Sequence, residues 1–180
     1  MANTGKGINI EKSRRRARLA GCMGLALATW SAQAATTIDP ALAKELLTQA
    51  ARLSNRELPA NLAPPPLIPV TARVINEQIC PEAADGCPHI IAAYSVLNRN
   101  ILYREELDLA SPMGRSFLIH EFTHFLQHHE FGDRINASCK MVLSMERQAY
   151  SVQRIYLKFQ GHPVVMNLPY QLPRCREDPG

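Results

Sequence analysis

Two histidines and a glutamate near the middle of the chain have the types and the spacing that a catalytic metal site needs. His120, Glu121 and His124 belong to the run His-Glu-Phe-Thr-His. Residues four apart lie one turn apart on the same helix face, so both imidazoles can reach one ion. Glu121 lies next to that face, where a carboxylate can accept a proton from a metal-activated water molecule. The HExxH pattern is typical of zinc hydrolases.

The residues around this motif predict a helix that is buried on most of its circumference. Apolar side chains fill the stretch from Ser116 to Glu130, namely Phe117, Leu118, Ile119, Phe122, Phe125 and Leu126. Ionisable side chains inside such a helix cost free energy unless they are paired or bound to a metal. The alternative is that both are ordinary core histidines with satisfied hydrogen bonds. A third metal ligand elsewhere in the chain would favour the metal site over this alternative.

A third ligand is expected from a second helix, at 138–159. Its apolar and aromatic residues recur with the period of a helix, and Glu146 lies close to the inward stripe. Glu146 follows His124 by 22 residues, enough for a helix end, a short turn and two turns of an antiparallel helix. We therefore expect His120, His124 and Glu146 to hold Zn²⁺ with a fourth position open for water. The alternative is an exposed glutamate paired with a neighbouring basic side chain.

Other ionisable residues near the motif fit the site less well. In the HExxHxxGxxH class of zinc enzymes, the glycine lets the chain turn and return a third histidine. Gln127 stands at that glycine position and Glu130 at that histidine position, so the helix should run on and carry Glu130 away. His128 is expected beside the ligands or at the helix end, and His129 in solvent.

Residues 1–34 are predicted to be a secretory signal peptide, which implies a periplasmic or extracellular location. Arginines precede an apolar run, Leu19–Trp30, that is too short to span a bilayer, and Ala32–Ala34 has the small-x-small cleavage pattern. The sequence at Leu19–Cys22 superficially matches a lipoprotein box, but the arginines end directly before it and the apolar run follows the cysteine. Lipidation is therefore disfavoured.

Removal of this leader changes the charge balance. The leader holds six of the 20 Lys+Arg and one of the 16 Asp+Glu, which leaves 14 against 15 and a net charge of −1. The basic isoelectric point therefore belongs to the leader and gives no reason to expect a nucleic-acid or anionic-membrane partner. The remaining 146 residues, 35–180, suit a single domain with one core and contain no second run that could anchor it in a membrane.

Four cysteines remain in this domain, at Cys80, Cys87, Cys139 and Cys175. An even number in an exported domain predicts disulfides. Cys80 and Cys87 would close a loop whose prolines and glycine favour a turn, and by elimination Cys139 pairs with Cys175. A second metal site from these cysteines is the alternative, but neither pair has C-x-x-C spacing.

The rest of the chain predicts one more helix and a small sheet. Asp39 and Pro40 have the types of a helix N-cap and first residue, and an amphipathic pattern follows at 41–52. A proline-rich connector, extended and lying on the surface, is expected at 59–69. Strands are expected at 70–75, 90–96 and 101–104, with a turn at 97–100. A strand just upstream of the HExxH helix can offer its unpaired edge to an extended peptide.

These motifs resemble the gluzincin group of zinc metallopeptidases, especially small exported bacterial members. The resemblance covers 90–159 and rests on the HExxH run and on Glu146-x-x-Ala149-Tyr150. It implies an α+β, zincin-like fold in which a small antiparallel or mixed sheet packs on the HExxH helix and a second, glutamate-bearing helix. It also implies zinc on both motif histidines and Glu146, with Glu121 as general base. The large second subdomain of bigger gluzincins, which supplies a residue that stabilises the oxyanion, is missing here.

The sequence therefore predicts a secreted or periplasmic zinc metallopeptidase that acts on peptides or proteins. Tyr150, one turn beyond Glu146, is the best local candidate for an oxyanion donor, and a core tyrosine with a bonded hydroxyl is its alternative. His162 is a weaker candidate. Two other functions stay open: a zinc-stabilised module that binds a partner without catalysis, and a zinc hydrolase of a non-peptide amide such as a cell-wall linkage. The oligomeric state is not predicted.

Overall fold

The computed structural model describes residues 38–79 and 90–162, all within the second of two units of the chain, Ala34–Gly180. The predicted signal peptide and Cys80, Cys87 and Cys175 lie outside the described residues, so the leader and both disulfides stay predictions. The described elements, in order, are α1 (Pro40–Leu53), β1 (Leu67–Val70), α2 (Ala72–Ile79), β2 (Ala92–Ser95), β3 (Asn100–Arg104), α3 (Pro112–Phe131), the 3₁₀ turn η1 (Gly132–Asn136) and α4 (Cys139–Phe159). The predicted α+β class is confirmed.

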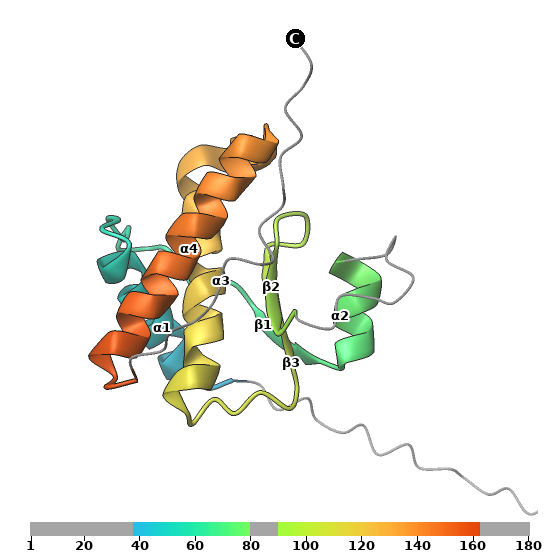
Figure 1. Cartoon of the computed structure of the whole chain (residues 1–180), viewed down its shortest axis with the longest axis vertical. Helices are drawn as coiled ribbons and strands as arrows, with labels where there is room; N and C mark the ends of the chain where they lie inside the picture. The colour runs from blue at the N-terminus through green and yellow to red at the C-terminus, as the bar shows by residue number, and fades with distance from the viewer. Residues whose placement is uncertain (1–37, 80–89, 163–180) are drawn as a thin grey trace, which may run out of the picture. The chain divides into compact units, whose positions relative to one another are not determined.

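The small sheet is mixed and has β2 at one edge. Its strand order is β1-β3-β2, with β1 parallel and β2 antiparallel to β3. A tight turn at 96–99 joins β2 to β3, and its last residue, Arg99, has a φ of 51°. The predicted hairpin at 90–104 is therefore confirmed. Because β2 pairs only with β3 among the described strands, the other edge of β2 is available to α3, which it contacts (Figure 1).

The predicted strand at 70–75 is wrong. The strand that pairs with β3 is Leu67–Val70, which takes up the end of the connector expected at 59–69 and only the first residue of the predicted strand. The residues from Ala72 form α2. Thr71 starts this helix because its hydroxyl accepts a hydrogen bond from the Val74 amide, at 3.4 Å, and its carbonyl accepts one from the Ile75 amide. Apolar residues at every second position are typical of a strand, but over so few positions the pattern also fits a short amphipathic helix. In α2 one residue, Ile75, is buried.

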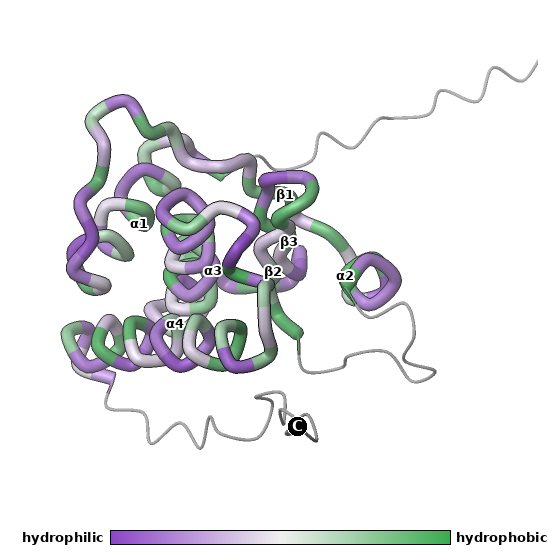
Figure 2. Tube along the Cα trace, turned by 90° about the horizontal axis from the view of Figure 1, so that it is seen from above, coloured by the Kyte–Doolittle hydropathy of each residue, from purple (hydrophilic) through white to green (hydrophobic). Residues whose placement is uncertain are grey.

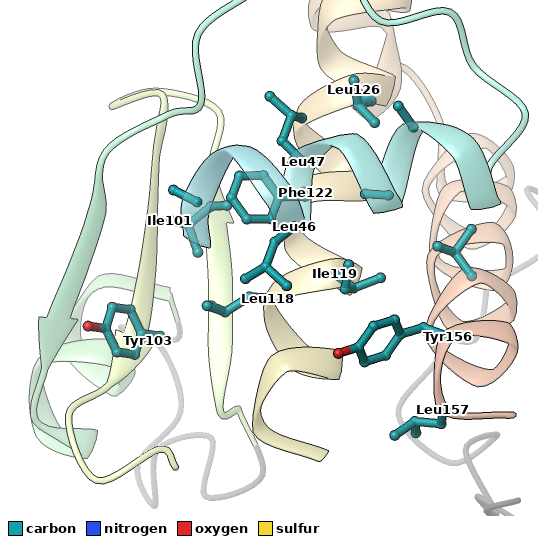
Figure 3. Packing of buried hydrophobic residues seen from close by; sticks show 14 residues of the cluster. Leu46, Leu47, Ile101, Tyr103, Leu118, Ile119, Phe122, Leu126, Tyr156 and Leu157 are labelled. Carbon is teal, nitrogen blue, oxygen red and sulfur yellow. The ribbon is translucent and has the colours of Figure 1, made fainter. Parts of the chain in front are cut away.

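The predicted first helix is confirmed with its cap. The Asp39 carboxylate accepts a hydrogen bond from the Ala41 amide at 2.9 Å, and Pro40 occupies the first turn. The buried face of α1 faces α3, where Leu46 and Leu47 lie beside Phe122 (Figure 3). This packing removes one side of α3 from solvent.

The HExxH helix α3 is the centre of the domain. Ser111 caps its start with a 3.0 Å bond from the Gly114 amide, and Gly132, with a φ of 60°, ends it. Helix α3 contacts α1, α4, β2 and β3, and it lies between α1 and α4 when the domain is viewed from above (Figure 2). A helix enclosed in this way must bury polar as well as apolar side chains, as predicted for 116–130.

Helix α4 runs back along α3 as the predicted antiparallel partner. Ser138 caps its start by accepting a 3.1 Å bond from the Met141 amide. Ala149, Val152 and Tyr156 belong to the stripe of apolar residues that the sequence predicted to face inward, and all three are buried. Ile155 and Phe159 were predicted on the same stripe but are exposed. A fully buried polar contact also joins the helices, because the Gln153 side-chain amide donates to the Ser116 hydroxyl at 3.0 Å.

The first turn of α3 has no room for a side chain at Gly114. A Cβ atom there would lie 1.9 Å from the Asp108 carbonyl oxygen, which itself accepts a hydrogen bond from the Ser111 hydroxyl. Glycine to alanine ordinarily stabilises a helix, by up to ~1 kcal/mol. We predict that Gly114→Ala instead lowers the free energy of unfolding by about 1–3 kcal/mol, because the preceding loop must move. Urea unfolding measures this change, and a gain in stability would contradict it.

Candidate metal centre

The packing of α4 on α3 brings the three predicted metal ligands together. His120 Nε2 lies 3.1 Å from His124 Nε2. The Glu146 carboxylate reaches both rings, with one oxygen 3.4 Å from His120 Nε2 and the other 3.2 Å from His124 Nε2. All three ligand atoms lie within 4.8 Å of one another. The predicted convergence of these residues is confirmed, and the group could hold a metal ion.

The charges in this group are arranged to attract a cation. Burial alone would lower the pKa of His124, but its hydrogen bond to Glu146 and the negative charges of Glu121 and Glu146 outweigh burial and raise the pKa to about 9. Burial alone would raise the pKa of Glu146, but hydrogen bonds to His120 and His124 hold that pKa well below its usual range. The carboxylate is therefore ionised, and without a metal its charge is balanced by a proton on His124.

Glu121 lies beside the metal-binding group without being part of it. Its side chain is buried, with 7% of the residue exposed, and one carboxylate oxygen accepts a 2.7 Å bond from the Tyr94 backbone amide. That amide therefore points from the β2 edge toward α3. One oxygen of Glu121 is fixed by β2, and the other remains for a further hydrogen bond.

Tyr150 packs its ring directly against a metal-ligand candidate. The ring centroids of Tyr150 and His120 lie 4.4 Å apart at 61°. Burial, together with the negative charges of Glu146 and Glu121, raises the pKa of Tyr150 to about 12. Its phenol therefore stays protonated at neutral pH and can donate a hydrogen bond beside the group.

The residues that the sequence ranked lower lie elsewhere. Glu130 is 51% exposed and forms an ion pair with Arg56 at 2.9 Å. His128 is one turn past His124 but bonds to the Tyr94 hydroxyl, at 2.8 Å. His129 is exposed at the end of α3 and His162 is exposed just after α4. The placements of Glu130, His128 and His129 agree with the prediction that these three residues do not bind the metal. The role of His162 as a weaker candidate for an oxyanion donor stays a prediction.

Two residues near the group were not predicted as functional. Gln127 is fully buried and lies 2.8 Å from His124 Nδ1 through its side-chain oxygen. A signal for it was present, because a polar residue three positions after a ligand lies on the same helix face. Tyr94, whose amide holds Glu121, gave no comparable signal, since it belongs to a strand far from the motif in sequence.

The donor set fits a divalent transition-metal ion. Two imidazoles and one carboxylate are the protein ligands of a well-known class of catalytic zinc sites. His124 is already oriented by Gln127 in the way that metal-binding histidines usually are. Within the described residues, His120 Nδ1 is buried without a hydrogen-bond partner. The three protein atoms that would bind the metal therefore all come from α3 and α4.

Comparisons of the chain with protein-family models, with curated proteins and with solved structures found no match. The likeness to gluzincins therefore rests on the residues of the two motifs and on their geometry. In the part of the chain that the structure describes, no helix has the length and apolar character needed to cross a membrane.

Metal binding should stabilise the folded domain. We predict that zinc at about 100 times its dissociation constant raises the free energy of unfolding by about 2.7 kcal/mol. Glu146→Ala should abolish this gain, whereas the matched variant Glu57→Ala, at an exposed glutamate outside the group, should keep it. Thermal unfolding of chelator-treated protein, with and without added zinc, measures the effect. Equal zinc stabilisation of both variants would exclude Glu146 as a ligand.

Proposed function

We propose that this protein is an exported, zinc-dependent metallopeptidase of the gluzincin type, with a zincin-like domain. The observation that carries the proposal is the convergence of the His120, His124 and Glu146 donor atoms within 4.8 Å, beside a buried glutamate. A structural metal site needs no such glutamate. A hydrolytic site needs a base next to the metal.

Zinc is the favoured metal because of the donor set. Two histidines and one glutamate leave a fourth position open in a tetrahedral site, which is the arrangement of catalytic rather than structural zinc. When bound, zinc would activate water for attack and polarise the carbonyl of the scissile bond. His120, His124 and Glu146 would hold it, and the remaining steps belong to side chains of this domain.

Glu121 is suited to act as the general base. Its fixed oxygen accepts from the Tyr94 amide, at 2.7 Å, so the carboxylate cannot rotate freely. The second oxygen can accept the proton of the attacking water and later deliver it to the leaving amine. Tyr150, whose ring lies against His120, is suited to donate a hydrogen bond to the developing oxyanion, because its phenol stays protonated.

The position of β2 supports a peptide rather than another amide as the substrate. The edge of β2 that is not paired with β3 faces α3 beside Glu121, as the Tyr94–Glu121 bond demonstrates. An extended peptide can bind such an edge through main-chain hydrogen bonds, here to groups other than the Tyr94 amide, which already donates to Glu121. A substrate held there would place its backbone next to the proposed base, and a compact non-peptide amide would gain nothing from the strand.

We predict that Glu121→Gln abolishes peptide cleavage but keeps metal binding. The loss should reach about 10²–10⁴-fold, because the amide can still accept from Tyr94 but cannot take up a proton. Cleavage of a peptide library, followed by mass spectrometry, measures activity, and elemental analysis measures bound zinc. Glu57→Gln, a change at an exposed glutamate outside the metal-binding group, is the control and should retain activity. An active Glu121→Gln protein would refute the mechanism.

We also predict that Tyr150→Phe lowers kcat by about 10²-fold, because one oxyanion donor is lost. KM and zinc affinity should change little, since phenylalanine keeps the packing against His120. Tyr156→Phe, a buried tyrosine on the same helix, is the matched control. If both variants have wild-type kcat, Tyr150 is only a core residue, as the alternative reading of its position holds.

A further inference from the structure

We propose that Arg56, acting through Gln148 and Gln127, selects which ring nitrogen His124 presents to the metal. The inference rests on the metal site proposed above and assigns three positioning residues to it. The three act through one another and come from separate parts of the chain: the segment after α1, helix α4 and helix α3.

The two ring nitrogens of His124 face different surroundings. Nε2 lies 3.2 Å from a Glu146 oxygen and 3.1 Å from His120 Nε2, at the metal-binding group. Nδ1 lies 2.8 Å from the side-chain oxygen of Gln127. A neutral imidazole carries one N–H, and only its other nitrogen can bind a metal. Metal binding at Nε2 therefore requires the hydrogen to be on Nδ1.

The orientation of the Gln127 amide enforces this arrangement. Its Nε2 donates to the Met145 backbone carbonyl at 3.0 Å and to the Gln148 side-chain oxygen at 2.9 Å. Both partners are oxygen acceptors, so a flipped amide would set oxygen against oxygen in a fully buried place. The Gln127 oxygen must therefore face His124, where it can only accept, and Nδ1 must donate.

Gln148 is oriented in turn by Arg56. The same Gln148 oxygen that accepts from Gln127 accepts from Arg56 Nη2 at 2.9 Å. A guanidinium can donate but never accept, so it admits only the oxygen of Gln148 at that position. Arg56 is fixed by the exposed carboxylate of Glu130, 2.9 Å from its Nε, and only 12% of its own side chain is exposed. Arg56, which can only donate, thus fixes the orientation of Gln148, and Gln148 and the Met145 carbonyl, which can only accept, together fix the orientation of Gln127.

Of the two histidines, Arg56, Gln148 and Gln127 orient only His124. Among the described residues, Nδ1 of His120 is buried without a hydrogen-bond partner, so no comparable chain of bonds orients that ring. Loss of the chain should therefore affect His124 specifically. Partners that orient a ligand in this way typically contribute about 10–100-fold to metal affinity.

The test compares Arg56→Met, which removes the donor, with Arg56→Lys, which keeps a charged group that can only donate. Gln148→Met interrupts the chain at its middle and serves if Arg56→Met does not fold. Arg52→Met, at an exposed arginine of α1, is the control. Zinc affinity is measured by competition with a chromogenic chelator. We expect a loss of about 10-fold or more for Arg56→Met and Gln148→Met, partial recovery in Arg56→Lys and no change in Arg52→Met.

A spectroscopic measurement separates positioning from a general loss of stability. In zinc-loaded protein with ¹⁵N-labelled histidine, the His124 Nδ1–H signal should be present and exchange slowly with water. In Arg56→Met it should exchange faster or be lost, while the His120 signals stay unchanged. Wild-type affinity with an unchanged Nδ1–H signal in Arg56→Met would overturn the proposal, and so would equal losses in Arg56→Met and Arg56→Lys.

The chain of hydrogen bonds from Arg56 through Gln148 and Gln127, here called the relay, can be tested even if the protein binds no zinc. In metal-free protein, the side-chain amide protons of Gln127 both have acceptors, so they should exchange slowly in the wild type and faster in Arg56→Met. If the protein binds no zinc but shows this difference in exchange, the proposed metal site is wrong and the relay is supported. Equally fast exchange in both proteins would overturn the relay.

Discussion

The candidate site depends on the register of α4 along α3. One hydrogen bond between the helices, from Gln153 to Ser116 at 3.0 Å, lies before the ligand histidines on α3, and another, from Gln127 to the Met145 carbonyl at 3.0 Å, lies after them. The ligand group lies between these two contacts. A slip of α4 by one turn would break both buried bonds and carry Glu146 away from the imidazoles, so the packing that makes the core also assembles the metal-binding group.

The same group explains how a core helix tolerates buried ionisable side chains. In the absence of a metal, the raised pKa of His124 and the lowered pKa of Glu146 describe an ion pair, in which a proton balances the carboxylate. A bound cation would take the place of that proton, so the geometry needed for binding is present beforehand. Binding should then release a proton, as expected for a histidine ligand.

Local signals in the sequence were sufficient to predict α1, α3 and α4 and the three residues of the candidate metal-binding group. Asp39 caps α1 as the sequence predicted, and α4 begins one residue after its predicted start at Ser138. The spacing from His124 to Glu146 correctly predicted an antiparallel pair of helices. The strand at 70–75 was wrong because alternating apolar residues over six positions also fit one short helix, and pairing with β3, a non-local interaction, decided the outcome.

Hydrogen bonds between distant residues could not be predicted. Arg56 and Gln148 are 92 positions apart, and Tyr94 and Glu121 are 27 apart. No periodicity or spacing links such pairs, because their contact depends on how whole elements pack. For Gln127, the sequence could predict its position on the same face of α3 as the histidines. It could not predict the role of this residue, because that depends on hydrogen-bond partners in α4.

The most direct measurement is a crystal structure of zinc-loaded protein with anomalous diffraction data at the zinc absorption edge. We predict one strong anomalous peak per chain, at about 2.0–2.2 Å from His120 Nε2, His124 Nε2 and a Glu146 oxygen. A crystal grown with excess zinc that shows no peak between these three residues, or a peak bound by other side chains, would contradict the proposed metal centre.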